Sequence, residues 1–306
     1  MGSQRVHGVE STPRRKRRKA PARAEREPGL IALQRSAGNA AVTQALSVQR
    51  SPAPAAARQE DLGGIGARFA VDQYVGVAHK LQQNWGRLTP FGRAKVLVNA
   101  VNFELAHIDV PPVELKMENL DHDAGRFDSE SWAMEIDRPH FAGAKIDDGA
   151  AAENASTIYH EARHAEQDFL VGRMLAGKKM KAAEIAEKFD MRVDVAAAAA
   201  KQPLTGAGED RRRASKFYES EVGKHADERS TTLDDLHLFD ERVAALQAAW
   251  LQASSPEEDK KAKEKLDIEV AARDAAYAAY RALPEEADAW EVGDAVKKAY
   301  SKSKQP

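Results

Sequence analysis

One pentapeptide constrains the fold more than any other feature: residues 160–164 are His-Glu-Ala-Arg-His. Residues four apart share a helix face, so His160 and His164 can direct both imidazoles at one metal ion. Glu161 lies about 100° round the helix, within reach of a water molecule that such a metal activates. Neutral imidazole is a good zinc ligand, and a catalytic zinc site needs three protein ligands and one open position. The pentapeptide therefore predicts a helix that carries two zinc ligands and a base.

The flanking sequence predicts that this helix is continuous. No Pro or Gly interrupts residues 150–171, and N-cap candidates lie just upstream, namely Asn154, Ser156 and Thr157. An apolar stripe at helical spacing contains Ile158, Ala162, Ala165 and Phe169. Both histidines and Gln167 lie on a different side. We therefore expect the helix to pack with one face and to present the metal ligands on another.

Composition limits the kinds of metal ligand and of protein. The chain of 306 residues is long enough for one large domain or two small ones, and its 42% of apolar side chains supports a core. No run approaches the roughly 20 apolar residues of a membrane span. It contains no cysteine, which excludes disulfides and thiolate ligands and leaves His, Asp and Glu. The basic N-terminus lacks the apolar segment of a secretory signal, so we expect no signal peptide.

The first 61 residues differ in composition from the remainder. Residues 1–29 are predicted to be a disordered basic tail, residues 30–50 a short amphipathic helix, and residues 51–61 a Pro/Ala linker. Six consecutive cations at 14–19 are typical either of a nucleic-acid or nuclear-import patch or of a solvated tail. Because no aromatic residues lie among them, we do not expect nucleic-acid binding. The folded body is predicted at residues 62–306.

Within the body, the pattern predicts a mostly helical α+β fold. Helices are expected at 67–83 and 90–105, and a helical segment at about 206–281 is expected to contain long helices at 217–250 and 260–281. A loose connection is expected at 196–200 and 205–215. Alternating apolar residues within 109–141 predict a small antiparallel sheet. Trp132–Ile136 lies just ahead of the helix expected at the His-Glu-Ala-Arg-His segment. That segment resembles the helix of zincins, in which this place belongs to the edge strand that pairs with an extended peptide.

The third metal ligand is expected to be a carboxylate in the last helix, which Pro284 opens. Glu285 and Glu286 both border an apolar stripe, and a carboxylate that faces a core is costly unless it is paired or metal-bound. Acidic residues in a first turn also simply complement the helix dipole. Periodicity does not choose between the two glutamates. Further candidates lie within the helical segment: Glu219, His225 and Asp227.

Two of these segments resemble known metallopeptidases. Residues 160–167, His-Glu-Ala-Arg-His-Ala-Glu-Gln, resemble the H-E-x-x-H-x-x-Q helix of small zincin-like metallopeptidase domains in bacterial toxins. Residues 286–289, Glu-Ala-Asp-Ala, are similar to the E-x-x-A element of gluzincins, in which the glutamate is the third zinc ligand. This resemblance implies Glu286 rather than Glu285. The chain departs from the family where Ala162 and Arg163 follow His-Glu, and where over one hundred residues separate Glu286 from His164.

A third segment resembles proteins of a secretion device. Residues 33–42, Leu-Gln-Arg-Ser-Ala-Gly-Asn-Ala-Ala-Val, are similar to the L-Q-R-x-A-G-N-x-A-V segment of proteins encoded with extracellular contractile injection systems. The resemblance implies a toxin or effector cargo that binds the injection particle through this N-terminal segment. Such a cargo would be cytoplasmic in the producing bacterium and then delivered outside it or into a target cell.

Together, the resemblances imply a zincin-like zinc metallopeptidase that acts on a protein or peptide. Zn²⁺ would be held by His160, His164 and Glu286, and Glu161 would be the general base. Candidates for stabilising the oxyanion are Tyr277, Tyr280 and His225. The alternative is a non-catalytic zincin-like binding or adaptor module of an injection system.

Overall fold

A computed structural model describes residues 62–120 and 123–303. This part of the chain consists mainly of helices with one small three-stranded sheet, which confirms the mostly helical α+β class. The predicted basic tail, amphipathic helix and Pro/Ala linker, at residues 1–29, 30–50 and 51–61, lie outside the described residues, as does the injection-system-like segment 33–42.

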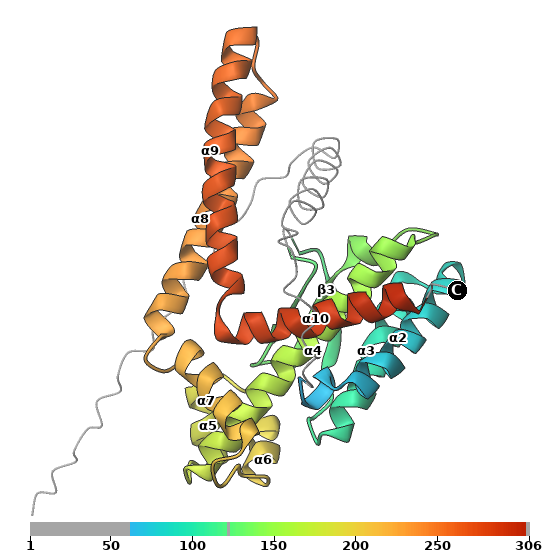
Figure 1. The fold of residues 1–306 in the computed structure, drawn as a ribbon, viewed down its shortest axis with the longest axis vertical. Coiled ribbons are helices and arrows are strands. Elements are labelled where there is room, and N and C mark those ends of the chain that lie inside the picture. Colours follow the sequence, from blue (N-terminus) through green and yellow to red (C-terminus); the bar gives the residue numbers. More distant parts are fainter. Residues whose placement is uncertain (1–61, 121–122, 304–306) are drawn as a thin grey trace, which may run out of the picture. The chain divides into compact units, whose positions relative to one another are not determined.

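Helix α4 (Asp148–Gly177) carries the pentapeptide and contacts more elements than any other described helix, among them α10, α7, α6, α3 and β2 (Figure 1). It begins at an Asp147 cap, whose carboxylate accepts a hydrogen bond from the Ala150 N–H. The predicted apolar stripe of Ile158, Ala162, Ala165 and Phe169 is fully buried. The expectation of a single packed face was wrong, because small alanine side chains let neighbouring elements approach the helix on most sides.

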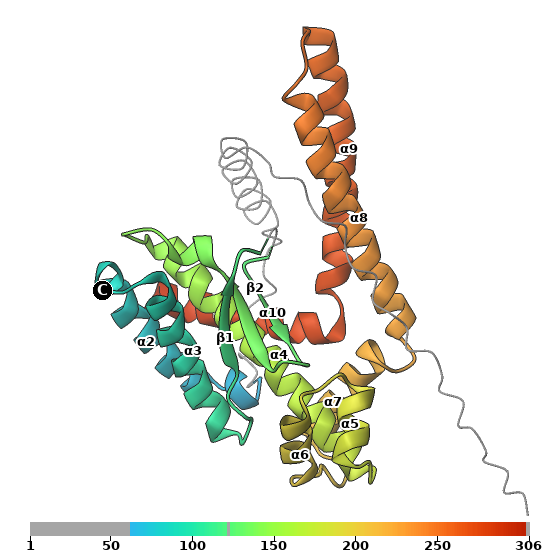
Figure 2. The ribbon, with the colours of Figure 1, turned by 180° about the vertical axis from the view of Figure 1, so that it is seen from behind.

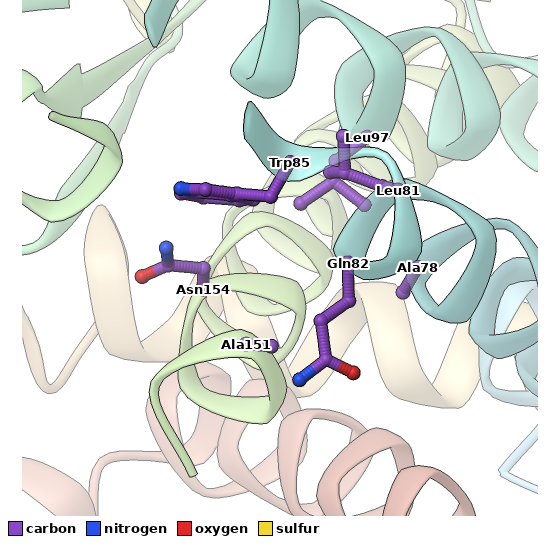
Figure 3. Close-up of a pocket in the computed structure, with 7 residues that line it drawn as sticks. All are labelled: Ala78, Leu81, Gln82, Trp85, Leu97, Ala151 and Asn154. Carbon is purple, nitrogen blue, oxygen red and sulfur yellow. The ribbon is translucent and has the colours of Figure 1, made fainter. Parts of the chain in front are cut away.

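Helices α2 (Arg68–Gln83) and α3 (Pro90–His107) pack on each other and both contact α4, which confirms the two helices expected at 67–83 and 90–105. Thr89 caps α3 by accepting a hydrogen bond from the Gly92 N–H. Near these helices and α4 lies a small cavity of about 10 Å³. Figure 3 shows the residues that line it: Ala78, Leu81, Gln82, Trp85, Leu97, Ala151 and Asn154. It has room for about one water molecule and is too small for an organic ligand.

The sheet contains β1 (Glu114–Glu118), β2 (Gly125–Asp128) and β3 (Ala133–Asp137), in the order β1-β3-β2 (Figure 2). Strand β3 is antiparallel to β2 but parallel to β1, so the predicted purely antiparallel sheet was wrong. The prediction of Trp132–Ile136 as the edge was also wrong, because β3 is the central strand. All its residues are buried, and Glu135 is held between Lys116 of β1 and Arg126 of β2. The edge strand beside α4 is β2.

Three helices pack at the C-terminal end of α4: α5 (Ala182–Lys188), α6 (Val193–Ala200) and α7 (Glu209–Glu221). The loose connection expected at 196–200 is instead the end of α6, whose Ala196 and Ala199 are buried. The single helix expected at 217–250 is also wrong, because α7 ends at Glu221 and α8 (Ala226–Trp250) begins after a short connection that contains Gly223.

Helices α8 and α9 (Pro256–Arg281) lie side by side as an antiparallel pair (Figures 1 and 2). Val243 and Leu266 are their only buried residues, and they meet the other described elements mainly at α7 and α10. Pro284 opens α10 (Pro284–Lys302) as predicted, and this helix packs on α4 and α2. No helix in the described part of the chain combines the length and apolar character that a membrane span requires.

The start of the described body is fastened to α4. The Arg163 guanidinium donates hydrogen bonds to the carbonyls of Leu62 and Gly63, and the Glu166 carboxylate accepts one from the Ile65 N–H at 3.1 Å. Gly64 has a φ of 57°, and a Cβ there would lie 1.9 Å from Glu166 Oε1. Only glycine meets both requirements without strain.

We expect Gly64→Ala to lower the free energy of unfolding by about 1–3 kcal/mol, because it adds left-handed strain and displaces Glu166. The matched control is Gly76→Ala in α2, where an added Cβ meets no atom within 4 Å. Alanine there should raise the free energy of unfolding by about 0.5–1 kcal/mol, since it is the better helix former. Urea denaturation of both variants and of the wild type measures the free energies of unfolding. If Gly64→Ala loses less than about 1 kcal/mol, the steric argument is contradicted.

Candidate metal centre

The packing of α4 on α10 brings two imidazoles and one carboxylate together (Figure 1). His160 Nε2 lies 3.1 Å from His164 Nε2 and 3.5 Å from Glu286 Oε2. His164 Nε2 lies 3.6 Å from Glu286 Oε1. His160 and Glu286 are buried and His164 is half-buried, and no other group of His, Asp and Glu among the described residues could hold a metal ion.

These separations fit a zinc ion. Ligand atoms about 2.0–2.1 Å from a tetrahedral centre lie about 3.3 Å from one another, close to the three distances in the site. A further feature favours a cation there. The buried Glu286 Oε2 has no hydrogen-bond partner among the described residues, and buried polar atoms without a partner are rare. The donor set of two His and one Glu is also one that zinc accepts.

The charges of the site are strongly coupled. Burial alone would raise the pKa of Glu286, but His164 and His160 prevail and hold it well below its ordinary value. Burial opposes the charged form of His164, yet the adjacent Glu286 raises the pKa of His164 to about 10. The ionised Glu286 therefore stabilises positive charge at this position, whether it is a proton or a metal ion.

Glu161 lies beside the ligands and against the edge strand. Its side chain is buried, and burial raises the pKa of its carboxyl group, an effect that His160 and His164 only partly offset. A Cβ built on Gly125 of β2 would lie 3.4 Å from Glu161 Cγ, so this side chain packs closely against the strand. This carboxylate is placed to accept a proton from a group at the metal site.

The structure separates the two glutamates that periodicity left equivalent. Glu286 faces the imidazoles, whereas Glu285 Oε1 accepts a hydrogen bond from Arg229 Nε of α8 at 2.7 Å. Both carboxylates are buried, at 2% exposure for Glu285 and 5% for Glu286. The buried negative charge of Glu285 is thus paired with an arginine, and that of Glu286 with two histidines.

The other candidate ligands from the helical segment do not join the site. Glu219 Oε2 accepts a hydrogen bond from the Lys224 N–H, and exposed His225 lies beside Glu228. Asp227 is exposed in the first turn of α8. Because His225 lies outside the site, it is also no longer a candidate for stabilising the oxyanion.

Aromatic residues of α9 and α10 border the site. Tyr280 lies near Glu286 and Glu161, and burial followed by the charge of Glu286 raises the pKa of its hydroxyl well above the ordinary value. The Trp290 ring packs edge-on against His160 at 4.7 Å between centroids, and Tyr277 lies 6.4 Å from Trp290. Of the three predicted oxyanion candidates, Tyr280 is the one whose charge environment includes both Glu286 and Glu161.

Sequence reasoning missed the residues that hold the ligands in place. Gln167 contacts His164 and α10, Asp288 accepts hydrogen bonds from both Gln167 and Arg163, and Trp290 supports His160. One signal was present in the sequence, because Gln167 shares the helix side of the two histidines. The roles of Asp288 and Trp290 depend on how α10 docks, which no local pattern specifies.

Comparison of this chain with protein-family models, with curated proteins and with solved structures finds no match.

Proposed function

We propose that this protein is a zincin-like zinc metallopeptidase. The observation that carries the proposal is the buried group of His160, His164 and Glu286 with Glu161 next to it. A purely structural zinc site would have no use for a carboxylate base at this place, and structural sites have four protein ligands rather than three. The alternative, a non-catalytic binding or adaptor module, needs no Glu161.

The chemistry assigned to the site is hydrolysis of a peptide bond. Bound zinc would supply a Lewis acid that makes water more acidic and polarises the scissile carbonyl. Glu161 takes a proton from the attacking water as its oxygen bonds to the carbonyl carbon. As the C–N bond breaks, Glu161 gives that proton to the leaving nitrogen. Its burial next to the imidazoles suits a group that must both accept and release a proton.

A protein or peptide is the proposed substrate because an edge strand lies beside the base. Among the described residues, strand β2 pairs with β3 alone, and Gly125 at its start lies close to Glu161. An extended peptide can add to such an edge through main-chain hydrogen bonds, which would bring its carbonyl groups past Glu161.

The proposed biological role rests on residues 33–42 and their resemblance to injection-system proteins. We assign the protein as toxin or effector cargo of a contractile injection system, loaded through this segment and delivered from the producing bacterium. The particle and the peptide substrate are therefore the two proposed partners.

The first prediction concerns metal content. The purified protein should bind about one zinc per chain, and His160→Ala or His164→Ala should abolish tight binding because each removes a ligand. His140→Ala is the control, since this exposed histidine lies outside the ligand group. Metal analysis after dialysis measures the stoichiometry. Full zinc content in either ligand variant would move the site elsewhere.

The second prediction concerns the base. Glu161→Gln should keep zinc and the fold while peptide cleavage falls by at least about a hundredfold, because only the proton acceptor is removed. Glu153→Gln is the matched control on the same helix, where the exposed carboxylate pairs with Lys297. Cleavage of a peptide library provides the assay. Near-wild-type cleavage by Glu161→Gln would exclude this mechanism, and no cleavage by either wild type or variant would favour the binding module.

The third prediction separates the two adjacent glutamates. Glu286→Ala should weaken zinc binding at least tenfold, because loss of a ligand costs no less than the roughly 10–100-fold typical of residues that support ligands. Glu285→Ala should change zinc affinity little, since its carboxylate pairs with Arg229. Chelator competition measures both affinities, and the reverse order would assign the third ligand to Glu285.

A further inference from the structure

Gln167 links the two helices that carry the metal ligands. It is fully buried on α4, one turn beyond His164. Its Oε1 lies 2.9 Å from His164 Nδ1, and its Nε2 donates hydrogen bonds to the backbone carbonyl of Glu285 at 2.9 Å and to Asp288 Oδ2 at 2.8 Å. One side chain thus contacts one histidine ligand and two residues close to Glu286 on α10, at positions 285 and 288.

These partners fix the orientation of the Gln167 amide. A backbone carbonyl accepts hydrogen bonds but cannot donate them, and both carboxylate oxygens of Asp288 already accept hydrogen bonds from Arg163. The amide NH₂ must therefore face α10, which leaves Oε1 facing His164. Since Oε1 only accepts, His164 Nδ1 must carry a hydrogen. In the neutral imidazole, the form that binds a metal ion, the lone pair of His164 then lies on Nε2, the atom that faces His160 and Glu286.

The other end of the link is rigid as well. Arg163 donates to Asp288 through Nε at 2.7 Å and through Nη2 at 3.2 Å, and Arg163 itself is fully buried. Such paired guanidinium–carboxylate bonds fix direction as well as distance. Asp288 is therefore a fixed acceptor for Gln167, two residues after Glu286. Arg163, one of the two residues at which the helix differs from the zincin motif, thus holds Asp288 in place.

We propose that Gln167 is a positioning residue, which holds His164 in the tautomer that binds metal and holds the first turn of α10 so that Glu286 faces the imidazoles. This inference rests on the proposed metal site but not on the proposed peptidase reaction. Groups that orient metal ligands typically contribute about 10–100-fold to metal affinity.

The test compares Gln167→Met with Ser156→Ala. Methionine has a similar volume but forms none of the three hydrogen bonds of the amide. The control removes another buried hydrogen bond between α4 and α10, from Ser156 Oγ to the Gly293 carbonyl at 3.0 Å, in which none of the three ligand side chains takes part. Chelator competition should show zinc affinity about 10–100-fold lower in Gln167→Met and changed less than about threefold in Ser156→Ala. The proposal is overturned if Gln167→Met binds within threefold of wild type, or if both variants lose affinity equally.

Gln167→Glu tests the effect on the His164 tautomer separately from the effect on α10. It also replaces Gln167→Met as the test variant if that protein does not fold. Its carboxylate still accepts from His164 but no longer donates to α10. In the zinc-loaded protein, the Nδ1–H proton of His164 should remain detectable by nitrogen-15 NMR, while zinc affinity falls as in Gln167→Met. Unchanged affinity would overturn the link to α10, and loss of the Nδ1–H signal would overturn the tautomer argument. Wild-type protein that binds zinc but cleaves no peptide would overturn only the peptidase proposal, whereas absence of zinc binding would overturn both.

Discussion

The packing of α10 on α4 is the contact on which the site depends. His160 and His164 are neighbours by helix geometry alone, but Glu286 reaches them only because two helices more than one hundred residues apart dock at one position. That docking buries several charges, and a buried charge is stable only when it is paired. Arg163 meets Asp288 and Glu166, Arg229 meets Glu285, and Glu286 meets the two imidazoles. The Arg163–Glu166 pair lies within α4, and the other pairs connect α10 to α4 and α8.

The sequence was most informative where the chemistry is local. The H-E-x-x-H spacing, the uninterrupted run around it and Pro284 placed the two helices that matter, and the structure has both. Helical spacing fixes which residues of one helix share a face, so it sufficed for His160 and His164. The choice of Glu286 needed the E-x-x-A resemblance, because Glu285 and Glu286 differ by only one helical step and both are buried. What distinguishes them physically is Arg229, which another helix supplies.

The errors came from partners that are distant in sequence. Trp132–Ile136 was expected at the edge of the sheet, but Glu135 within it is buried because Lys116 and Arg126 from both neighbouring strands pair with it. A strand with two such neighbours is central, which no pattern within the strand reveals. The break after Glu221 was missed because helical composition continues across Val222–His225, although Gly223 marks the connection.

Among the residues that the structure describes, the α8–α9 pair contacts residues of the site only through the start of α8 and the end of α9. Arg229 in the first turns of α8 contacts Glu285, and Arg281 at the end of α9 stacks over Trp290 at 4.2 Å, so both ends of the pair support residues next to the ligands. The connection after Trp250 lies about 30 Å along the helix from Arg229, at 1.5 Å per residue. Because the chain contains no cysteine, one introduced in this exposed connection would accept a single fluorophore and report on the protein without touching the metal centre.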